Sequence, residues 1–236
     1  MKKTMNLKPM TEGGKIRTPL RLLLIVLLSA LAAGLGYAVS TLSSQAPGLS
    51  EWVAANLESS GVSNPVTAVL LNFRGYDTVL EMGVLLVALL GVWSLGGIPE
   101  QRESSAGPVL DMLSRLLVPV LILVAGYLLW AGADAPGGAF QAGSVLGAAG
   151  VLLLLAGWRP EPRFAGLPLR IILTMGLGLF VVMGIVSMLM GGRLLQYPRS
   201  FAGVLILLIE AAATLSIGMT LAALFRGSRP GAKLDR

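Results

Sequence analysis

Glu210 is the residue of this chain whose type and place are best suited to relaying a proton or a cation. It stands in the apolar run FAGVLILLIEAAATLSIGMTLAALF, nine residues after its first residue, fifteen before its last and four before Thr214. In a helix that position lies about 15 Å into a bilayer core about 30 Å thick. A charge at that depth costs several kcal/mol unless it is paired or hydrated, so we interpret Glu210 as part of an ion path. The alternative is a protonated glutamic acid that only hydrogen bonds a neighbouring helix.

A second group of charges lies at the mouth of the apolar run Met82–Leu95. Arg74, Asp77 and Glu81 fall within eight residues of one another. If the segment is helical, Arg74, Thr78 and Glu81 share one face, and Asp77 lies one turn before Glu81. The spacing therefore predicts two neighbouring carboxylates with a guanidinium nearby, which suits an ion path. The alternative is that these charges lie among the lipid headgroups and only cap a helix.

A glycine-rich turn precedes another apolar segment and reads Pro136-Gly137-Gly138-Ala139-Phe140. Paired glycines allow backbone conformations closed to other residues and let a neighbouring group approach closely. Beyond the turn, Ala139, Gly143 and Gly147 recur every fourth residue. Small residues at that spacing are typical of closely packed membrane helices, which we prefer to the alternative of ion coordination by freed carbonyl groups.

The composition is that of an integral membrane protein. Of 236 residues, 55% are apolar and 13% are charged, and the mean hydropathy is +0.79; soluble chains carry about 25% charged residues. Cysteine and histidine are absent, so acid–base chemistry falls to carboxylates. No nucleophile–base pair or metal-ligand cluster can be assembled, so we expect neither an enzyme nor a cofactor. The net charge of +6 resides in loops and tails, which fits membrane topology better than nucleic-acid binding.

We expect an all-α fold with about six membrane-spanning helices, near residues 22–42, 78–95, 113–131, 138–157, 168–190 and 200–225. Residues 65–73 are too short to span, and a short amphipathic helix is expected around residues 51–57. A basic start before the first apolar run could indicate a signal peptide, but the run is longer than usual, so an uncleaved helix is expected. The expected organisation is a basic tail (1–21), a two-helix module with an external loop (22–98), a linker (99–109), a four-helix domain (110–226) and a second tail (227–236).

The basic residues predict which side each loop faces. With six spans and the N-terminus inside, fifteen of the eighteen lysines and arginines lie on the inner side, leaving Arg74, Arg193 and Arg199 outside. Inner loops of membrane proteins carry an excess of lysine and arginine, so both termini are predicted to be cytoplasmic.

Two motifs resemble known families. Residues 105–226, with the turn Pro136–Phe140 and the acidic Glu210 in the last helix, resemble the MnhB domain family, the B-type subunits of Mrp-type multisubunit Na⁺/H⁺ antiporters. Residues 64–97 resemble a companion module found at the C-terminal end of the large A-type antiporter subunits and as a small subunit of membrane-bound hydrogenases. Its signature Phe-Arg-Gly-x-Asp-Thr-x-x-Glu stands at residues 73–81.

The resemblance implies a non-catalytic, multi-pass subunit of a monovalent cation (Na⁺)/proton antiporter complex in the cell inner (plasma) membrane. Its partners would be other membrane subunits, including large antiporter-like subunits, with Na⁺ and H⁺ as the transported ions and no nucleic acid. The lack of further buried charges favours one part of a larger complex. The alternatives are a membrane-arm subunit of a hydrogenase-like or other redox-driven ion pump, and a purely structural membrane adaptor whose glutamates join helices.

Overall fold

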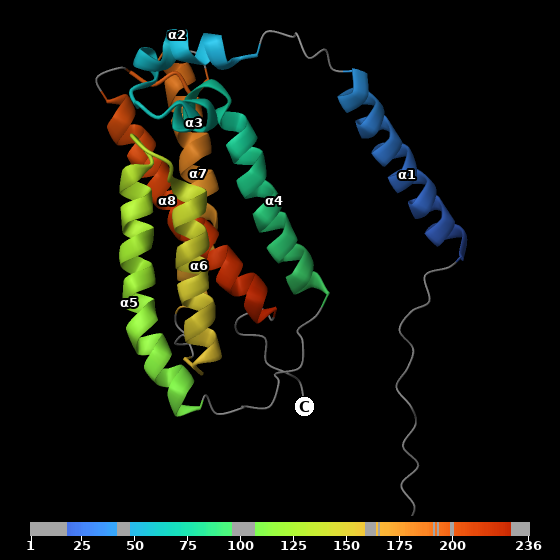
Figure 1. Ribbon diagram of the computed structural model, residues 1–236, viewed down its shortest axis with the longest axis vertical. Helices are drawn as coiled ribbons and strands as arrows, with labels where there is room; N and C mark the ends of the chain where they lie inside the picture. Colours follow the sequence, from blue (N-terminus) through green and yellow to red (C-terminus); the bar gives the residue numbers. More distant parts are fainter. Residues whose placement is uncertain are drawn as a thin grey trace, which may run out of the picture. The chain divides into compact units, whose positions relative to one another are not determined.

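The computed structural model describes residues 18–41, 48–95, 107–158, 164, 166–190, 192, 194–198 and 201–227, and within these ranges it is helical without strands. The elements are α1 (Thr18–Thr41), α2 (Ser50–Ser60), α3 (Pro65–Ala68), the π-helix η1 (Val69–Phe73), α4 (Gly75–Ser94), α5 (Pro108–Ala131), α6 (Ala139–Leu155), α7 (Leu167–Leu189) and α8 (Ala202–Arg226). Figure 1 shows their arrangement.

Five helices are long and apolar enough to cross a membrane, namely α1, α4, α5, α7 and α8, and α6 is a shorter apolar helix of 17 residues. The prediction of an all-α membrane protein with about six spanning helices is confirmed. The cytoplasmic placement of the termini stays a prediction. Most of the expected linker, residues 99–109, falls outside the described residues.

The chain divides into two units, residues 1–48 and 49–236. In the first unit every described side chain of α1 is exposed. A helix that is apolar on all sides needs lipid or another protein around it, so α1 has the character of a membrane helix. The second unit contains all the candidate functional residues.

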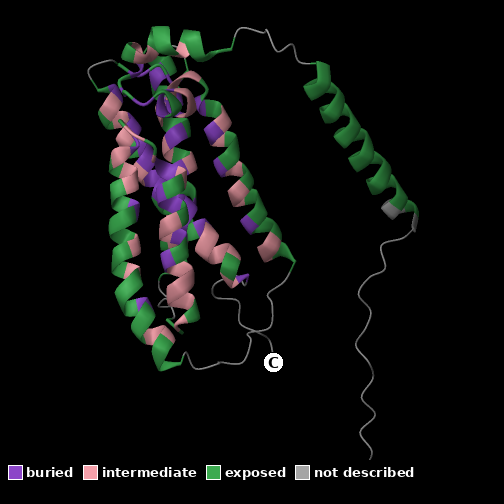
Figure 2. Cartoon of the chain, viewed as in Figure 1, coloured by how far each residue is buried: buried purple, intermediate pink, exposed green. Residues whose placement is uncertain are grey.

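Helix α8 is the centre of the second unit. It packs against α4, α5, α6 and α7, and Figure 2 shows buried residues concentrated along it. Ile206, Ile209, Ala213 and Ile217 of α8 are each no more than 3% exposed. The polar residues of this helix are buried as well: Glu210, Thr214, Ser216 and Thr220 are each no more than 5% exposed.

Glycines bring α6 into close contact with α8. A Cβ placed on Gly143 would lie 2.8 Å from the Cβ of Ile217, and one placed on Gly147 would lie 3.0 Å from the Cβ of Leu221. Position 143 leaves no room for a side chain, because real Cβ atoms do not approach so closely, and at position 147 the neighbouring Leu221 would have to shift by a few tenths of an ångström. The small-residue stripe expected from the sequence therefore lies in the α6–α8 contact.

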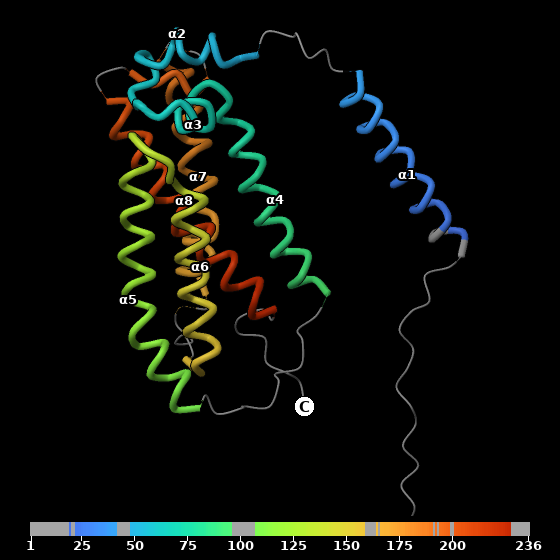
Figure 3. The backbone as a smooth tube through the Cα atoms, in the orientation of Figure 1, coloured from blue at the N-terminus to red at the C-terminus, as the bar shows by residue number. Residues whose placement is uncertain are grey.

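A broken helix joins α3 to α4 at the end of the second unit that carries α2 (Figure 3). Asn64 caps α3, its Oδ1 accepting from the N–H of Val66 at 3.0 Å. The π-helix η1 follows, and Arg74, with φ −128° and ψ 33°, leaves the helical conformation. The hydroxyl of Thr78 then donates to the carbonyl of Leu70 at 2.7 Å, satisfying a backbone group that the break sets free.

Tyr197, in the segment between α7 and α8, is bound to this broken helix. It is 5% exposed, and its hydroxyl donates to the carbonyl of Leu71 in η1 at 3.2 Å. Burial raises the pKa of Tyr197, so the phenol remains a donor through the physiological range.

Candidate functional site

The carboxylate of Glu210 lies at the first residue of α6. Glu210 is 3% exposed and stands eight residues after the start of α8, about 12 Å along the helix. The backbone N–H of Ala139 donates to its carboxylate, whereas Oε2 has no hydrogen-bond partner among the described residues. The N-terminal end of α6 also directs its partial positive charge at this group.

Two glycines of the α5–α6 turn contact the same carboxylate. Gly138, at φ +101°, is so close that a Cβ placed on it would lie 2.7 Å from Oε1 of Glu210. A Cβ placed on Gly132 would lie 3.4 Å from the same oxygen. The turn of residues 132–138 (the "132–138 turn") therefore covers Oε1, while Oε2 is buried without a hydrogen-bond partner among the described residues.

Polar residues at the start of α3 hold this turn from its other side. The amide Nδ2 of Asn64 donates to the carbonyls of Gly132 at 3.2 Å and Ala135 at 2.7 Å. The hydroxyl of Thr67 donates to the carbonyl of Gly132 at 2.5 Å. The backbone N–H groups of Ser63 and Asn64 both donate to the carbonyl of Ala133, at 3.1 and 2.9 Å.

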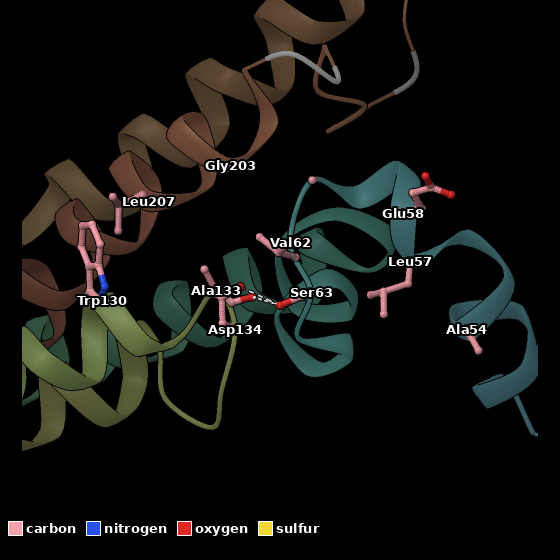
Figure 4. A pocket seen from close by; sticks show the side chains of 11 residues that line it. Ala54, Leu57, Glu58, Val62, Ser63, Trp130, Ala133, Asp134, Gly203 and Leu207 are labelled. Carbon is pink, nitrogen blue, oxygen red and sulfur yellow. Dashed lines mark hydrogen bonds between the residues drawn. The ribbon is translucent and has the colours of Figure 1, made fainter.

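A surface groove of about 680 Å³ lies beside the turn, lined in part by Leu57, Ser63, Trp130, Asp134 and Leu207. Figure 4 shows Ser63 and Asp134 joined at its edge, and the Ser63 hydroxyl donates to Oδ1 of Asp134 at 2.6 Å. Asp134 is exposed. The 132–138 turn therefore carries an accessible carboxylate at the edge of the groove, while its glycines contact Glu210.

Thr214 lies one turn after Glu210 and is 4% exposed. Its hydroxyl donates to the backbone carbonyl of Glu210 at 2.8 Å. That bond lies within α8. The predicted role of Thr214 in the ion path stays a prediction, supported only by its place one turn after Glu210.

The prediction that Arg74, Thr78 and Glu81 share one helical face is wrong. Arg74 precedes α4 and pairs with Asp77, its Nη2 lying 2.5 Å from Oδ2. Thr78 is buried and faces η1, whereas Glu81 is exposed. The π-helix and the break at Arg74 end the regular helical spacing before α4 begins, which takes Arg74 off the predicted face. Thr78 and Glu81 both lie within α4.

Glu81 lies one helical turn after Asp77 in α4, but it takes no part in the ion pair of Asp77 with Arg74. Within the described part of the chain it has no hydrogen bond or ion pair. The structure thus brings Arg74 and Asp77 together, seats Glu210 against the Pro136–Phe140 turn, and leaves Glu81 on the outer side of α4.

Sequence reasoning did not predict the meeting of Glu210 with the glycine turn. The two motifs are about 70 residues apart, and the pattern of the turn by itself indicates only helix packing. Asn64 and Thr67 were missed as well. The pair Asn64-Pro65 is a recognisable helix start, but nothing in it indicates that the amide reaches a turn in the second half of the chain.

The sequence model of the family described as "Domain related to MnhB subunit of Na+/H+ antiporter" matches residues 109–226. The chain belongs to the MnhB family. The matched range contains both Glu210 and the 132–138 turn that contacts its carboxylate.

Three relatives extend beyond the MnhB domain. The chain is 29% identical to a protein of Rhizobium meliloti (strain 1021) described as a probable K⁺/H⁺ antiporter subunit of the A/B type, over 72% of this chain and 20% of that protein. It thus spans about a fifth of the curated relative's length. Among solved structures, a chain of the Mrp complex from Dietzia sp. DQ12-45-1b matches with a TM-score of 0.63 and 22% identity, over 94% of this chain and 27% of that one.

The other solved structure is the archaeal membrane-bound sulfane sulfur reductase (MBS), described as a respiratory membrane complex. One of its chains matches with a TM-score of 0.63 and 23% identity, over 88% of this chain and 97% of the MBS chain. At these identities the two solved structures establish a shared fold. Membership of the MnhB family rests on the sequence match.

Proposed function

We propose that this MnhB-family chain is a membrane subunit of a multisubunit monovalent cation (Na⁺)/proton antiporter complex in the plasma membrane. In that complex it contributes carboxylates, Glu210 first among them, to an ion path. Other membrane subunits, including large antiporter-like subunits, are its partners, and the chain itself catalyses no reaction. Membership of a family named for a Na⁺/H⁺ antiporter subunit, the antiporter name of the Rhizobium meliloti relative and the fold shared with a chain of the Mrp complex support the proposal.

The observation that carries the proposal is the hydrogen bonding of the buried Glu210 carboxylate. A carboxylate that only joined helices would be expected to use both oxygens in hydrogen bonds, because an unpaired polar atom at this depth is costly. Here Oε2 has no partner in the described residues, and the N–H of Ala139 at the start of α6 donates to the carboxylate. Such a group can bind and release a proton or a monovalent cation.

The test compares Glu210→Gln and Glu210→Asp with wild type in vesicles that carry the assembled complex. Gln keeps the shape and a hydrogen-bonding oxygen but cannot exchange a proton, so we expect exchange to fall at least about tenfold while assembly is retained. Asp should keep part of the activity. Exchange is measured across a pH range with Na⁺ and with K⁺, because the curated relative is described as belonging to a K⁺/H⁺ antiporter.

Glu81→Gln and the double variant complete the test, with Glu51→Gln in the exposed first turn of α2 as the matched control. We expect a smaller loss for Glu81 and none for Glu51. If the double variant matched wild type in rate and pH profile at equal assembly, the ion-path proposal would be wrong and the structural-adaptor alternative would stand.

A membrane-arm subunit of a redox-driven ion pump is the second candidate, favoured by the fold shared with nearly the whole MBS chain. The two functions differ in their driving force. Exchange driven by an imposed cation gradient, with no electron donor, supports the antiporter. Ion movement that requires an electron donor supports the redox-driven pump.

A further inference from the structure

We propose that Asn64 and Thr67 are positioning residues for Glu210. They hold the 132–138 turn in place, and the turn held there determines the position of the buried carboxylate. The inference rests on the proposed function and adds residues that lie outside the matched family domain of 109–226. It makes the α3 segment a part of the ion site.

The first step is the burial and bonding of the two side chains. Asn64 and Thr67 are 7% and 4% exposed, and both donate to the carbonyl of Gly132, at 3.2 and 2.5 Å. Helix α5 ends at Ala131, so this carbonyl lacks a helical partner. At membrane depth a freed carbonyl needs a donor, and these two side chains supply it.

The second step is the place of Gly132 between α3 and Glu210. A Cβ placed on Gly132 would lie 2.7 Å from the N and Cα of Gly138 and 3.4 Å from Oε1 of Glu210. Gly138 in turn precedes Ala139, whose N–H binds the carboxylate. A shift of Gly132 must therefore move the groups that cover Oε1, because no space separates them.

The third step distinguishes this role from helix capping. Asn64 caps α3 through Oδ1, which accepts from Val66, while its Nδ2 binds the turn. The hydroxyl of Thr67 is directed at Gly132 rather than at the backbone of α3. The donors to the turn can thus be removed while the cap is kept.

The principal test replaces Thr67 by Val, which keeps the shape and removes the donor. In vesicles carrying the assembled complex we expect exchange to fall about fivefold, as for one buried hydrogen bond, and its pH profile to shift. Thr67→Ser keeps a hydroxyl and should restore both. The matched control is Thr220→Val, a buried threonine of α8 whose hydroxyl donates to Ser216 of its own helix.

Asn64→Asp is the second variant, because it keeps the capping oxygen and removes the Nδ2 donor. We expect the same direction of change, and this variant carries the test if Thr67→Val fails to assemble. A second readout follows Glu210 directly: the rate at which a hydrophobic carbodiimide modifies it in the purified complex, measured by mass spectrometry against pH. Thr67→Val should change that rate, and Thr220→Val should not.

The outcomes separate this inference from the proposed function. If Glu210→Gln abolishes exchange but Thr67→Val and Asn64→Asp match wild type in rate, pH profile and carbodiimide labelling, Asn64 and Thr67 do not position Glu210 and the proposed function stands. If Glu210→Gln exchanges ions normally, the proposed function fails. The labelling then decides on its own whether the two residues set the surroundings of Glu210.

Discussion

At the scale of single residues, Gly138 meets two separate demands. Its backbone lies at φ +101° and ψ −172°, a region essentially confined to glycine. Its missing side chain also leaves the space that Oε1 of Glu210 occupies. Only glycine satisfies both, which links the Pro-Gly-Gly turn to the buried carboxylate rather than to chain reversal alone.

Gly138→Ala should therefore affect Glu210 as well as the backbone. We expect a loss of about 1–3 kcal/mol in stability from the strained backbone, together with reduced ion exchange because the new methyl displaces the carboxylate. Gly157→Ala is the matched control, since Gly157 also has a positive φ, +84°, but nothing lies within 4 Å of its added Cβ. Thermal unfolding of the purified complex and vesicle exchange measure the two effects. Equal exchange by the two variants would contradict a contact between position 138 and Glu210.

At the scale of elements, the contact between α6 and α8 determines where Glu210 lies. Gly143 faces α8 with no room for a Cβ, and Gly147 faces it with room for one only if Leu221 shifts. The start of α6 is thereby held against the part of α8 that carries the carboxylate. The small-residue stripe of α6 can be interpreted from the sequence as a packing surface or as part of an ion site. In the structure one contact, that between α6 and α8, serves the packing and also sets the position of Glu210.

Gly143→Leu should force the two helices apart. Overpacking costs about 1–3 kcal/mol and more where backbone must move, so we expect weaker assembly and lower thermal stability. Gly178→Leu serves as control, because Gly178 of α7 has no atom within 4 Å of an added Cβ. Co-purification of the partner subunits and thermal unfolding report the result. Normal assembly of the Gly143 variant would mean that this face does not need its small residues.

Most helices could be predicted from the sequence, while the irregular elements could not. Runs of apolar residues bounded by glycine and proline placed α5, α7 and α8 within a few residues. The π-helix η1 is invisible to a periodicity argument that assumes 3.6 residues per turn, and it removed Arg74 from the face assigned to it. The bonds of Asn64 and Thr67 to Gly132 join residues 68 and 65 positions apart, and local patterns carry no information about such pairs.

At the scale of the whole molecule, one end of the second unit collects the irregular elements. Helices α2 and α3, the 132–138 turn and the start of α8 lie together there, while the C-terminal ends of α4, α6 and α8 lie toward the other end (Figure 1). The segments that the basic residues predict to be external thus share one end of the unit, and the side of the membrane that this end faces stays a prediction.

Topology reporters test that assignment directly. A reporter fused after Arg236 should be active only as a cytoplasmic reporter, and one inserted near Ser50 only as an external one, because fifteen of eighteen basic residues then face inward. Pairs of reporters that work on opposite sides of the membrane provide the internal control. Reversed signals at both sites would overturn the predicted orientation.

The short length of α6 has a consequence for the surrounding lipid. Its 17 residues give an apolar length of about 25 Å, less than a hydrocarbon core of about 30 Å, whereas α5 and α8 have 24 and 25 residues. Beside the exposed side of α6 the bilayer must thin, or acyl chains must cover the polar backbone of the 132–138 turn, at a cost that grows with each ångström of mismatch. Long-chain lipids should therefore increase the mismatch at the turn that covers Glu210, and short-chain lipids should reduce it.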